Sequence, residues 1–347
     1  MTALPPSPPP RPRRARRGAG GLTLSDVAHI AGVSPITVSR ALNTPEQVSP
    51  EKLARVREAV ARTGYVPNRV AGGLASSRSR LVAAIVPTIA SPMFLDTVHA
   101  LTDTLAQEGY QVMLGESGYD GTREDALLDA IIGRRPDGVV LTGVMHSVEG
   151  RRRLAAAGIP VVETWDLTPT PIDMLVGFSH EKAGSAAAEY LYERGARRPA
   201  MICADDQRAG LRQRGFCEAA ARLSLGKVPL RLVHAPTTIG DGRSALAALL
   251  ERDPGPDAVY CSSDVLALGA LIEARSQGIR IPGELRIFGF GDLDFAAHAD
   301  PALSTARIDG AAIGRQAARF LLERIAGGLE GTRIVDLGFT IIPRDSA

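Results

Sequence analysis

Four side chains close together near the N-terminus have the chemistry to contact a nucleic acid. Ser34, Thr37 and Ser39 carry small hydroxyl groups that can donate hydrogen bonds to phosphate oxygens, contacts that position a protein without reading bases. Arg40 follows directly, and its guanidinium can reach the O6 and N7 atoms of guanine with two hydrogen bonds. A phosphate contact by Arg40 is the alternative. These residue types are suited to double-stranded DNA.

Three short helices are predicted around these residues, over about 24–31, 35–42 and 50–63. Thr23 is the predicted N-cap of the first helix, and Asp26 three residues on completes a capping-box pattern. Ser34 and Ser49 precede the next two helices, each followed by a proline, which fits the first helical position. Only three residues, Gly-Val-Ser, separate the first two helices. This spacing is typical of a helix-turn-helix, whose second helix enters the major groove, although a helical hairpin with another role is the alternative.

Charge is divided unevenly along the 347 residues, whose formal net charge is +2. Residues 1–80 contain 13 Lys/Arg and 4 Asp/Glu, whereas the remainder contains 27 and 34. A basic N-terminal segment followed by an acidic remainder indicates that the N-terminal segment alone binds a polyanion. The alternative is that the basic tail has no function. Residues 1–21 are rich in Pro, Arg and Gly, and we expect them to be disordered. Residues 67–80 have the composition of a linker.

From Leu81 onward, apolar strand-like runs alternate with segments of helix length. Nine runs share this character: 81–86, 112–114, 138–141, 159–162, 175–177, 200–203, 230–233, 258–261 and 285–288. Continuous apolar strands followed by helices indicate parallel sheets covered on both faces. Nine such units fit two lobes better than one sheet. The predicted fold class is therefore α/β, with an all-α helix-turn-helix head and a two-lobed core of doubly wound parallel sheets.

Other features exclude several classes of function. The three cysteines have no metal-ligand spacing, and Cys203 and Cys261 lie in apolar runs typical of reduced core residues in a cytosolic protein. No apolar stretch reaches the roughly 18 residues needed to span a bilayer, and the N-terminus lacks the apolar segment of a secretory signal. Gly289-Phe290-Gly291 lacks the third glycine of a dinucleotide fingerprint. We therefore expect a cytoplasmic protein that is not an enzyme, with no cofactor, metal or membrane partner.

The run LTLSDVAHIAGVSPITVSRALN (22–43) resembles the DNA-binding head of the lactose-repressor (LacI/GalR) family. The similarity continues through GYVPNRVAGGL (64–74) and through YCSSDVLALGAL and DPALSTARI in the core, covering about residues 22–345. NTPEQVS, GIPVVE and VDLGFTIIP look closest to the gluconate-utilisation repressors of this family. The resemblance implies a homodimeric transcriptional regulator with a core like the periplasmic sugar-binding proteins. A transport-type sugar-binding protein is the alternative class.

The resemblance also implies a domain organisation: a disordered tail (1–21), a helix-turn-helix domain (22–66), a hinge (67–80), lobe 1 (81–195 and 308–331) and lobe 2 (196–307 and 332–347). The chain would cross between the lobes near 194–199, 306–307 and 331–333. No extra C-terminal coiled-coil segment is present for tetramer formation, so a dimer is expected.

Positions matching the family's DNA contacts are Thr23, Ser34, Pro35, Ile36, Thr37, Ser39, Arg40, Asn43, Asn68 and Leu74. Pro35 and Ile36 stand where the family most often sets sequence preference. Neither side chain can form a hydrogen bond, so we expect Ile36 to contact a thymine methyl group. Leu74 matches a leucine that inserts into the minor groove at the operator centre. Gly72 and Gly73 beside it weaken the hinge helix, which should order only on DNA.

A small-molecule effector is expected between the lobes, at the carboxyl ends of the strands. Matching positions are Thr88, Ser91, Phe94, Ser179, Lys182, Arg212, Ser263, Asp264, Gly291 and Asp292. Ser179 and Gly291 stand where the family often has an acid, while Lys182 and Arg212 are cationic. This balance favours an anionic ligand such as gluconate or 6-phosphogluconate. A neutral sugar or nucleoside is the alternative, with Lys182 and Arg212 solvated or in salt bridges.

Overall fold

The computed structural model describes residues 22–66, 78–119, 123–145, 147–251, 255–328 and 330–347. They form two units, one within residues 1–77 and one spanning 78–347. The predicted tail (1–21) and the predicted hinge contacts Asn68 and Leu74, with Gly72 and Gly73, lie outside the described residues.

The first unit is a head of three α-helices, α1 (Leu24–Ala31), α2 (Pro35–Asn43) and α3 (Pro50–Thr63), with a 3-10 turn, η1 (Pro45–Gln47), before α3. The Thr23 hydroxyl accepts a hydrogen bond from the Asp26 N–H, and the Asp26 carboxylate accepts one from the Thr23 N–H, which completes the capping box. Ser34 caps α2 through the Thr37 N–H. Ser49 forms no side-chain cap, so the start of α3 relies on Pro50 at its first position.

A small apolar core holds the three helices of the head together. Its buried members are Val27, Ala28, Ala31, Val38, Ala41, Val56 and Ala59. Gly32 ends α1 with φ 63°, and a Cβ at this position would collide with the Arg55 guanidinium, which donates to the Gly32 carbonyl. The tight turn therefore fixes α2 against α1, with the polar side of α2 facing solvent.

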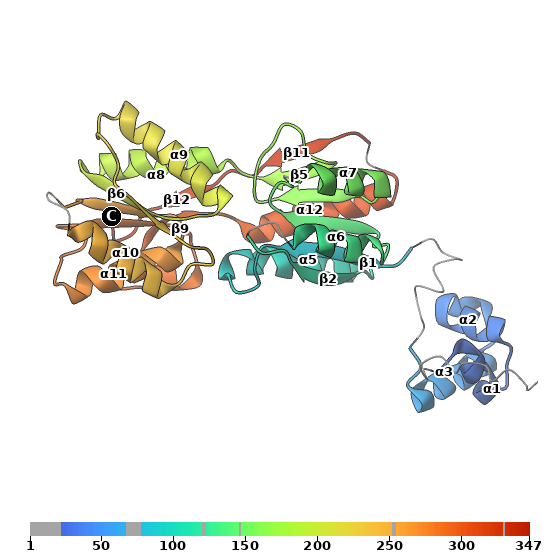
Figure 1. Ribbon diagram of the computed structural model, residues 1–347. Helices are drawn as coiled ribbons and strands as arrows, with labels where there is room; N and C mark the ends of the chain where they lie inside the picture. The colour runs from blue at the N-terminus through green and yellow to red at the C-terminus, as the bar shows by residue number, and fades with distance from the viewer. Residues whose placement is uncertain (1–21, 67–77, 120–122, 146, 252–254, 329) are drawn as a thin grey trace, which may run out of the picture. The chain divides into compact units, whose positions relative to one another are not determined.

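The second unit contains two six-stranded sheets, each covered by helices on both faces (Figure 1). The first sheet has the order β11-β5-β4-β3-β1-β2, and all of its pairs are parallel. Its strands are β1 (Leu81–Val86), β2 (Gln111–Glu116), β3 (Gly138–Thr142), β4 (Val161–Thr164), β5 (Met174–Gly177) and β11 (Arg333–Asp336). This parallel arrangement puts the carboxyl ends of its strands on one edge.

Alternating side chains of β1 show how both faces of the first sheet are buried. Val82 and Ala84 pack in a cluster with apolar residues of α5 (Leu95–Gln107) and α12 (Gly310–Ile325). Ala83 and Ile85 point to the opposite face, covered by α6 (Glu124–Ile132) and α7 (Val148–Ala157). A strand buried on both faces needs a continuous apolar run, which explains the sequence LVAAIV.

The second sheet has the order β12-β10-β9-β8-β6-β7, with only the β10–β12 pair antiparallel. Its strands are β6 (Pro199–Ala204), β7 (Leu230–Val233), β8 (Ala258–Cys261), β9 (Arg286–Gly291), β10 (Ser304–Arg307) and β12 (Thr340–Ile342). Helices α8 (His180–Glu193) and α9 (Gln207–Arg222) cover one face, and α10 (Ile239–Leu250) and α11 (Asp264–Ser276) cover the other.

Two of the predicted crossings between the lobes are wrong. Helix α8 packs on α9, β8 and β9 of the second sheet, so the chain leaves lobe 1 directly after β5 rather than near 194–199. Strand β11 pairs with β5 of the first sheet, so the last crossing follows Asp336 rather than 331–333. The crossing after β10 lies where it was predicted, because α12 packs on α5, β4 and β5. Lobe 1 therefore consists of 78–177 and 308–336, and lobe 2 of 178–307 and 337–347.

Within the described residues, no helix has both the length and the apolar character required to cross a bilayer.

Candidate functional site

The head presents a polar surface along α2. The Ser34 and Thr37 hydroxyls lie 2.9 Å apart, and the Asn43 amide donates to the Ser39 carbonyl at 3.0 Å. Arg40 is exposed, and its guanidinium has no hydrogen-bond or ion-pair partner among the described residues. The helix thus holds its short polar side chains in place by local hydrogen bonds and leaves the long cation available to a ligand.

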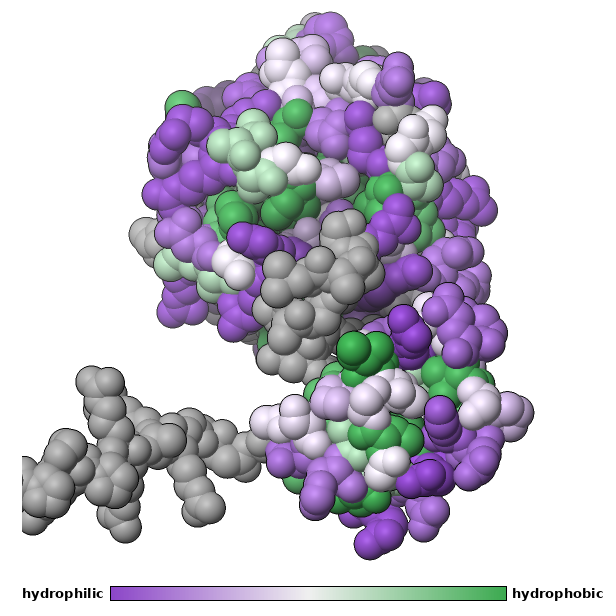
Figure 2. All heavy atoms as spheres, turned by 90° about the vertical axis from the view of Figure 1, so that its right-hand side faces the viewer, coloured by the Kyte–Doolittle hydropathy of each residue, from purple (hydrophilic) through white to green (hydrophobic). Residues whose placement is uncertain are grey.

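Apolar side chains also reach the surface of the head, where Figure 2 shows hydrophobic patches among hydrophilic ones. Ile36 is 65% exposed at the start of α2, beside the exposed Pro35. Single exposed apolar side chains are common on protein surfaces, so this exposure alone assigns no partner to Ile36, but it leaves the side chain accessible to one. The arrangement fits the predicted contact between Ile36 and a thymine methyl group.

A cavity of about 290 Å³ lies between the two lobes of the core. Residues that follow strands β1, β2 and β4 line it from lobe 1. His180, which follows β5 at the start of α8, and residues that follow β6, β7, β8 and β9 line it from lobe 2. Predicted effector residues in the lining are Ser91, Phe94, Arg212 and Ser263. Polar and aromatic lining residues not predicted from the sequence are Tyr119, Trp165, His180, Asp206, Arg208, Thr237, Thr238 and Ser262.

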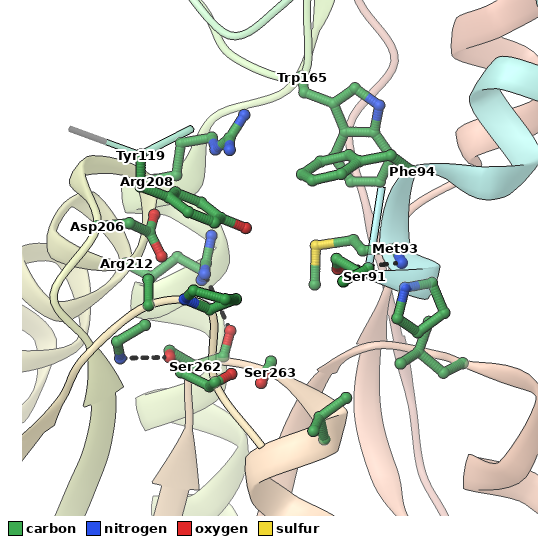
Figure 3. Close-up of a pocket in the computed structure, with 18 of the residues that line it drawn as sticks. Ser91, Met93, Phe94, Tyr119, Trp165, Asp206, Arg208, Arg212, Ser262 and Ser263 are labelled. Carbon is green, nitrogen blue, oxygen red and sulfur yellow. Dashed lines mark hydrogen bonds between the residues drawn. The ribbon is translucent and has the colours of Figure 1, made fainter. Parts of the chain in front are cut away.

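Lobe 1 contributes an aromatic wall (Figure 3). Phe94 and Trp165 pack edge to face, with ring centroids 5.1 Å apart, and Trp165 is the only tryptophan in the sequence. The Trp165 indole N–H donates to the Thr97 hydroxyl at 3.0 Å. Burial raises the pKa of the Tyr119 phenol, so this residue offers a neutral hydroxyl to the cavity.

Lobe 2 contributes two guanidinium groups from successive turns of α9, and Figure 3 shows both across the cavity from Phe94 and Trp165. Arg212 is only 4% exposed. Its Nη2 donates to the Ser262 carbonyl at 2.9 Å, and its Cζ lies 4.0 Å from the ring centroid of Phe290. Its Nε has no hydrogen-bond acceptor among the described residues.

Arg208 lies one helical turn before Arg212 and reaches across to lobe 1. Its Nη1 donates to the Thr142 carbonyl at 3.2 Å, and its Cζ lies 5.1 Å from the Phe94 ring centroid. Burial lowers the pKa of this guanidinium, against the opposing attraction of Asp206. Across the described parts of the chain, neither arginine forms an ion pair with a carboxylate within 4.0 Å.

His180 is buried beneath the cavity at the first turn of α8. Its Nδ1 lies 2.9 Å from Arg212 Nη1, and its Nε2 lies 2.8 Å from the Trp165 carbonyl oxygen. Because arginine can only donate, His180 Nδ1 must accept its hydrogen bond. The ring proton is therefore on Nε2, which donates a hydrogen bond to the Trp165 carbonyl. Burial and the charges of Arg212 and Arg208 lower the pKa of His180 well below its usual range, so the ring is neutral.

Three predicted effector residues lie away from the cavity lining in lobe 1 or at the start of α8. Thr88 is buried, and its hydroxyl accepts from the Ala90 N–H. Ser179 is the N-cap of α8, where its hydroxyl accepts from the Lys182 N–H at 3.2 Å. Lys182 itself is exposed. Of the two predicted cations, the structure therefore brings only Arg212 into the cavity.

Three more predicted effector residues, Asp264, Gly291 and Asp292, belong to lobe 2 but are not part of the cavity lining. Asp264 is fully buried and accepts hydrogen bonds from the Thr305 hydroxyl and the Leu293 N–H. Burial raises its pKa to about 6. Asp292 lies 2.6 Å from Arg307 Nε and 2.7 Å from Arg344 Nη1.

Gly291, which precedes Asp292, has φ 129°, a conformation that excludes most side chains. The hydrogen bonds of Asp264 and the ion pairs of Asp292 thus engage both carboxylates within the protein.

Sequence signals for the unpredicted lining residues were of unequal strength. Arg208 stands four residues before Arg212, so a helix containing both places them on one face. Arg208 was not predicted, but this spacing alone could have identified it as a second cation of the site. Trp165 and His180 carried no comparable signal, because they meet only when the lobes are assembled.

Comparison with known proteins assigns both units. Residues 23–68 match the model of bacterial regulatory proteins, lacI family, and residues 188–347 match a periplasmic binding protein-like domain. The HTH-type transcriptional regulator GntR of Pseudomonas aeruginosa is 39% identical over 332 residues, which cover 95% of this chain and 97% of that protein.

Two solved structures are similar over 94% of this chain and 99% of their own. A LacI-family transcriptional regulator from Silicibacter pomeroyi has a TM-score of 0.88 at 34% identity. The lac repressor dimer bound to operator has a TM-score of 0.80 at 24% identity, a likeness of fold.

A helix-turn-helix head and a two-lobed core with a central cavity define a DNA-binding transcriptional regulator, which is not an enzyme. The chain belongs to the lacI family of bacterial regulatory proteins. The family match of the head separates it from the transport-type sugar-binding proteins that the core alone resembles.

Proposed function

We propose that this regulator is a repressor of sugar-acid catabolism genes, released from a palindromic operator by an anionic sugar acid bound between the lobes. Gluconate and 6-phosphogluconate are the candidate ligands. The regulator would act in the cytoplasm, where its operator is, as a homodimer that presents two heads to the two halves of the palindrome.

The observation that carries the proposal is the Arg212 guanidinium. It is nine-tenths buried, yet its partners are a neutral imidazole, a carbonyl oxygen and an aromatic ring. A buried charge without an opposite charge is costly, and a carboxylate or phosphate in the cavity would supply one. The unsatisfied Nε and the nearby Arg208 add donors that a carboxylate accepts.

The family comparison supports the same ligand class. The chain is similar over nearly its whole length to GntR of Pseudomonas aeruginosa, and its sequence resembles the gluconate-utilisation repressors. The hydroxyls of Ser91, Tyr119 and Ser263 line the cavity as well and provide partners for a polyol.

Calorimetry on the full chain tests the ligand. Gluconate and 6-phosphogluconate should be titrated beside neutral glucose and ribose, with the emission of Trp165 as a second readout. We expect binding of at least one anion and weak or undetectable binding of the neutral sugars. Tight binding of a neutral sugar without a response to either anion would contradict the proposed ligand.

Deleting residues 1–66 tests the operator function separately. The head has its own core within 22–66, so its removal should abolish operator binding in a gel-shift titration and leave ligand binding intact. Retained sequence-specific binding by residues 67–347 would contradict the proposal.

A further inference from the structure

Four hydrogen bonds run from the cavity to the segments where the chain passes between the lobes. Arg212 Nη1 donates to His180 Nδ1 at 2.9 Å, and His180 Nε2 donates to the Trp165 carbonyl at 2.8 Å. The Trp165 indole donates to Thr97 Oγ1 at 3.0 Å, and the Thr97 hydroxyl donates to the Gly310 carbonyl at 2.9 Å. We name these five residues the cross-lobe relay.

The direction of every bond in the relay is fixed by chemistry. Arginine and indole nitrogens can only donate, and the two backbone carbonyls can only accept. One arrangement of protons therefore satisfies the whole chain, with neutral His180 protonated on Nε2. A proton on Nδ1 would face the Arg212 donor and break the first link.

The relay connects the two lobes and includes a residue at each of the first two crossings between them. Arg212 and His180 belong to lobe 2, and His180 is the first residue of α8, just after the first crossing. Trp165 and Thr97 belong to lobe 1. Gly310 is the first residue of α12, just after the second crossing.

The links are tight and buried. The Arg212, His180, Trp165 and Thr97 side chains are each at most 4% exposed. Trp165 has φ 64°, a left-handed conformation that costs a non-glycine residue free energy and persists only where surrounding contacts hold it. A Cβ added to Gly310 would lie 3.0 Å from Thr97 Oγ1 and 3.4 Å from the Trp165 ring. Movement of any one member therefore disturbs the next.

We propose that the cross-lobe relay makes lobe 1 respond to the anion that pairs with Arg212, with His180 and Thr97 as positioning residues. This inference rests on the proposed function. An anion that shifts the guanidinium leaves His180 Nδ1 without its donor, and a buried acceptor without a partner is unfavourable. His180 must follow Arg212, and the Trp165 backbone and the start of α12 follow His180.

The first test uses the hydroxyl of Thr97, which lies outside the cavity lining. Thr97→Val removes the hydroxyl at nearly constant volume, and Thr97→Ser keeps it as the matched control. The readout is the ratio of operator dissociation constants with and without saturating gluconate. We expect Thr97→Val to lower this ratio about tenfold and to change gluconate affinity less than about threefold, with Thr97→Ser close to wild type. A full ratio in Thr97→Val would overturn the relay.

The second test exchanges His180. Gln can accept from Arg212 and donate to the Trp165 carbonyl, whereas Phe can do neither. We expect His180→Phe to lower the same ratio about tenfold and His180→Gln to restore it to within about threefold of wild type. Equal behaviour of the two variants would show that His180 has only a packing role and would overturn the inference.

A third measurement needs no ligand, so it separates failure of the relay from failure of the proposed ligand. The emission of Trp165 in the full chain should be constant between about pH 5.5 and 8, because His180 stays neutral between Arg212 and the carbonyl. A transition near pH 6.5 that disappears in His180→Gln would show a protonated His180 and overturn the relay. Absence of gluconate binding by the wild type, with constant emission, would refute only the proposed ligand.

Discussion

Arg40 in the head and Arg212 in the core place the same functional group in opposite surroundings. The Arg40 guanidinium is exposed on α2 and has no protein partner among the described residues. The Arg212 guanidinium is buried, and its hydrogen-bond and ring partners among the described residues, His180, Ser262 and Phe290, are neutral. In water, salt ions screen a charge and exchange freely with a ligand. In the cavity, the proposed anionic ligand would itself supply the opposite charge.

Under the proposed function, the difference means that one chain recognises two anions by different physics. DNA phosphates meet an exposed surface, so binding releases counterions and depends steeply on salt. The proposed sugar acid would meet a desolvated arginine, where attraction is stronger and screening is weak. We therefore expect selectivity for a small anion over its neutral analogue at the buried site rather than at the exposed one.

The largest expected effect separates the two sites by ionic strength. Raising salt from 50 to 200 mM should weaken operator binding about 1,000-fold if the dimer contacts about six phosphates. Gluconate affinity should change by less than about threefold over the same range, because the cavity is partly shielded. Gel-shift and calorimetric titrations measure the two. Equal salt dependence would remove the distinction between the sites.

Truncating the buried cation should have the next largest effect. Arg212→Ala should weaken gluconate binding by about 2–5 kcal/mol, because the anion would enter a buried site without its charge partner. Lys182→Ala is the matched control, since it removes an exposed cation outside the lining, and it should change affinity less than about twofold. Calorimetry that finds similar losses in both variants would contradict the role given to burial.

Truncating the exposed cation should have a smaller effect, confined to DNA. Arg40→Ala should weaken operator binding by about 1–3 kcal/mol and leave gluconate affinity unchanged. Arg40→Lys keeps the charge and loses the planar pair of donors. Full operator specificity in Arg40→Lys would show a phosphate contact in place of guanine recognition.

The smallest expected effect concerns the pH dependence of stability, and it compares an exposed carboxylate, Asp26, with a buried one, Asp264. Hydrogen bonds from Thr23 lower the pKa of the exposed Asp26, so its contribution to stability is present at neutral pH and is lost as pH falls. Burial raises the pKa of Asp264 to about 6, so the native core holds this proton more tightly than the unfolded chain does. Its effect on stability is therefore reversed, and core stability should fall as pH rises from about 4 to about 6.

Asp264→Asn tests this reversal, because it removes the titration and keeps a similar shape. The wild type should lose up to about 1.4 kcal/mol per pH unit relative to the variant within that window. Denaturant unfolding followed by Trp165 emission reports the core alone, since the sequence has no other tryptophan. Identical pH slopes would contradict the buried titration.

The apolar runs of the sequence predicted nine strands, and each begins within two residues of an observed one, β1 to β9. Strands β10, β11 and β12 were not predicted. Two of them, β11 and β12, lie at sheet edges, and their side chains are exposed or only half-buried, so no continuous apolar run is needed. In β10, Ser304 and Thr305 are buried, and their hydroxyls bond to the Arg344 carbonyl and to Asp264. Such polar strands depend on partners far away in the sequence.

The candidate site was predictable to the extent that its residues belong to one helix. The α2 residues are neighbours in sequence, and a helix-turn-helix spacing is sufficient to place them together. The cavity draws residues from eight strand ends. Sequence order cannot show that Arg212 turns inward while Lys182 turns to solvent, or that His180 meets Trp165, because those orientations depend on how the lobes close.

The interrupted course of lobe 1 has a consequence for synthesis on the ribosome. The head finds all its core partners within residues 22–66, so it can fold as soon as it emerges. Lobe 1 must wait for α12 and β11, which are made only after the whole of the other sheet except β12. Until then the face of β1 carrying Val82 and Ala84 lacks half of its cover. The nascent chain therefore carries a folded head while part of the apolar core of lobe 1 is still uncovered, a state prone to aggregation.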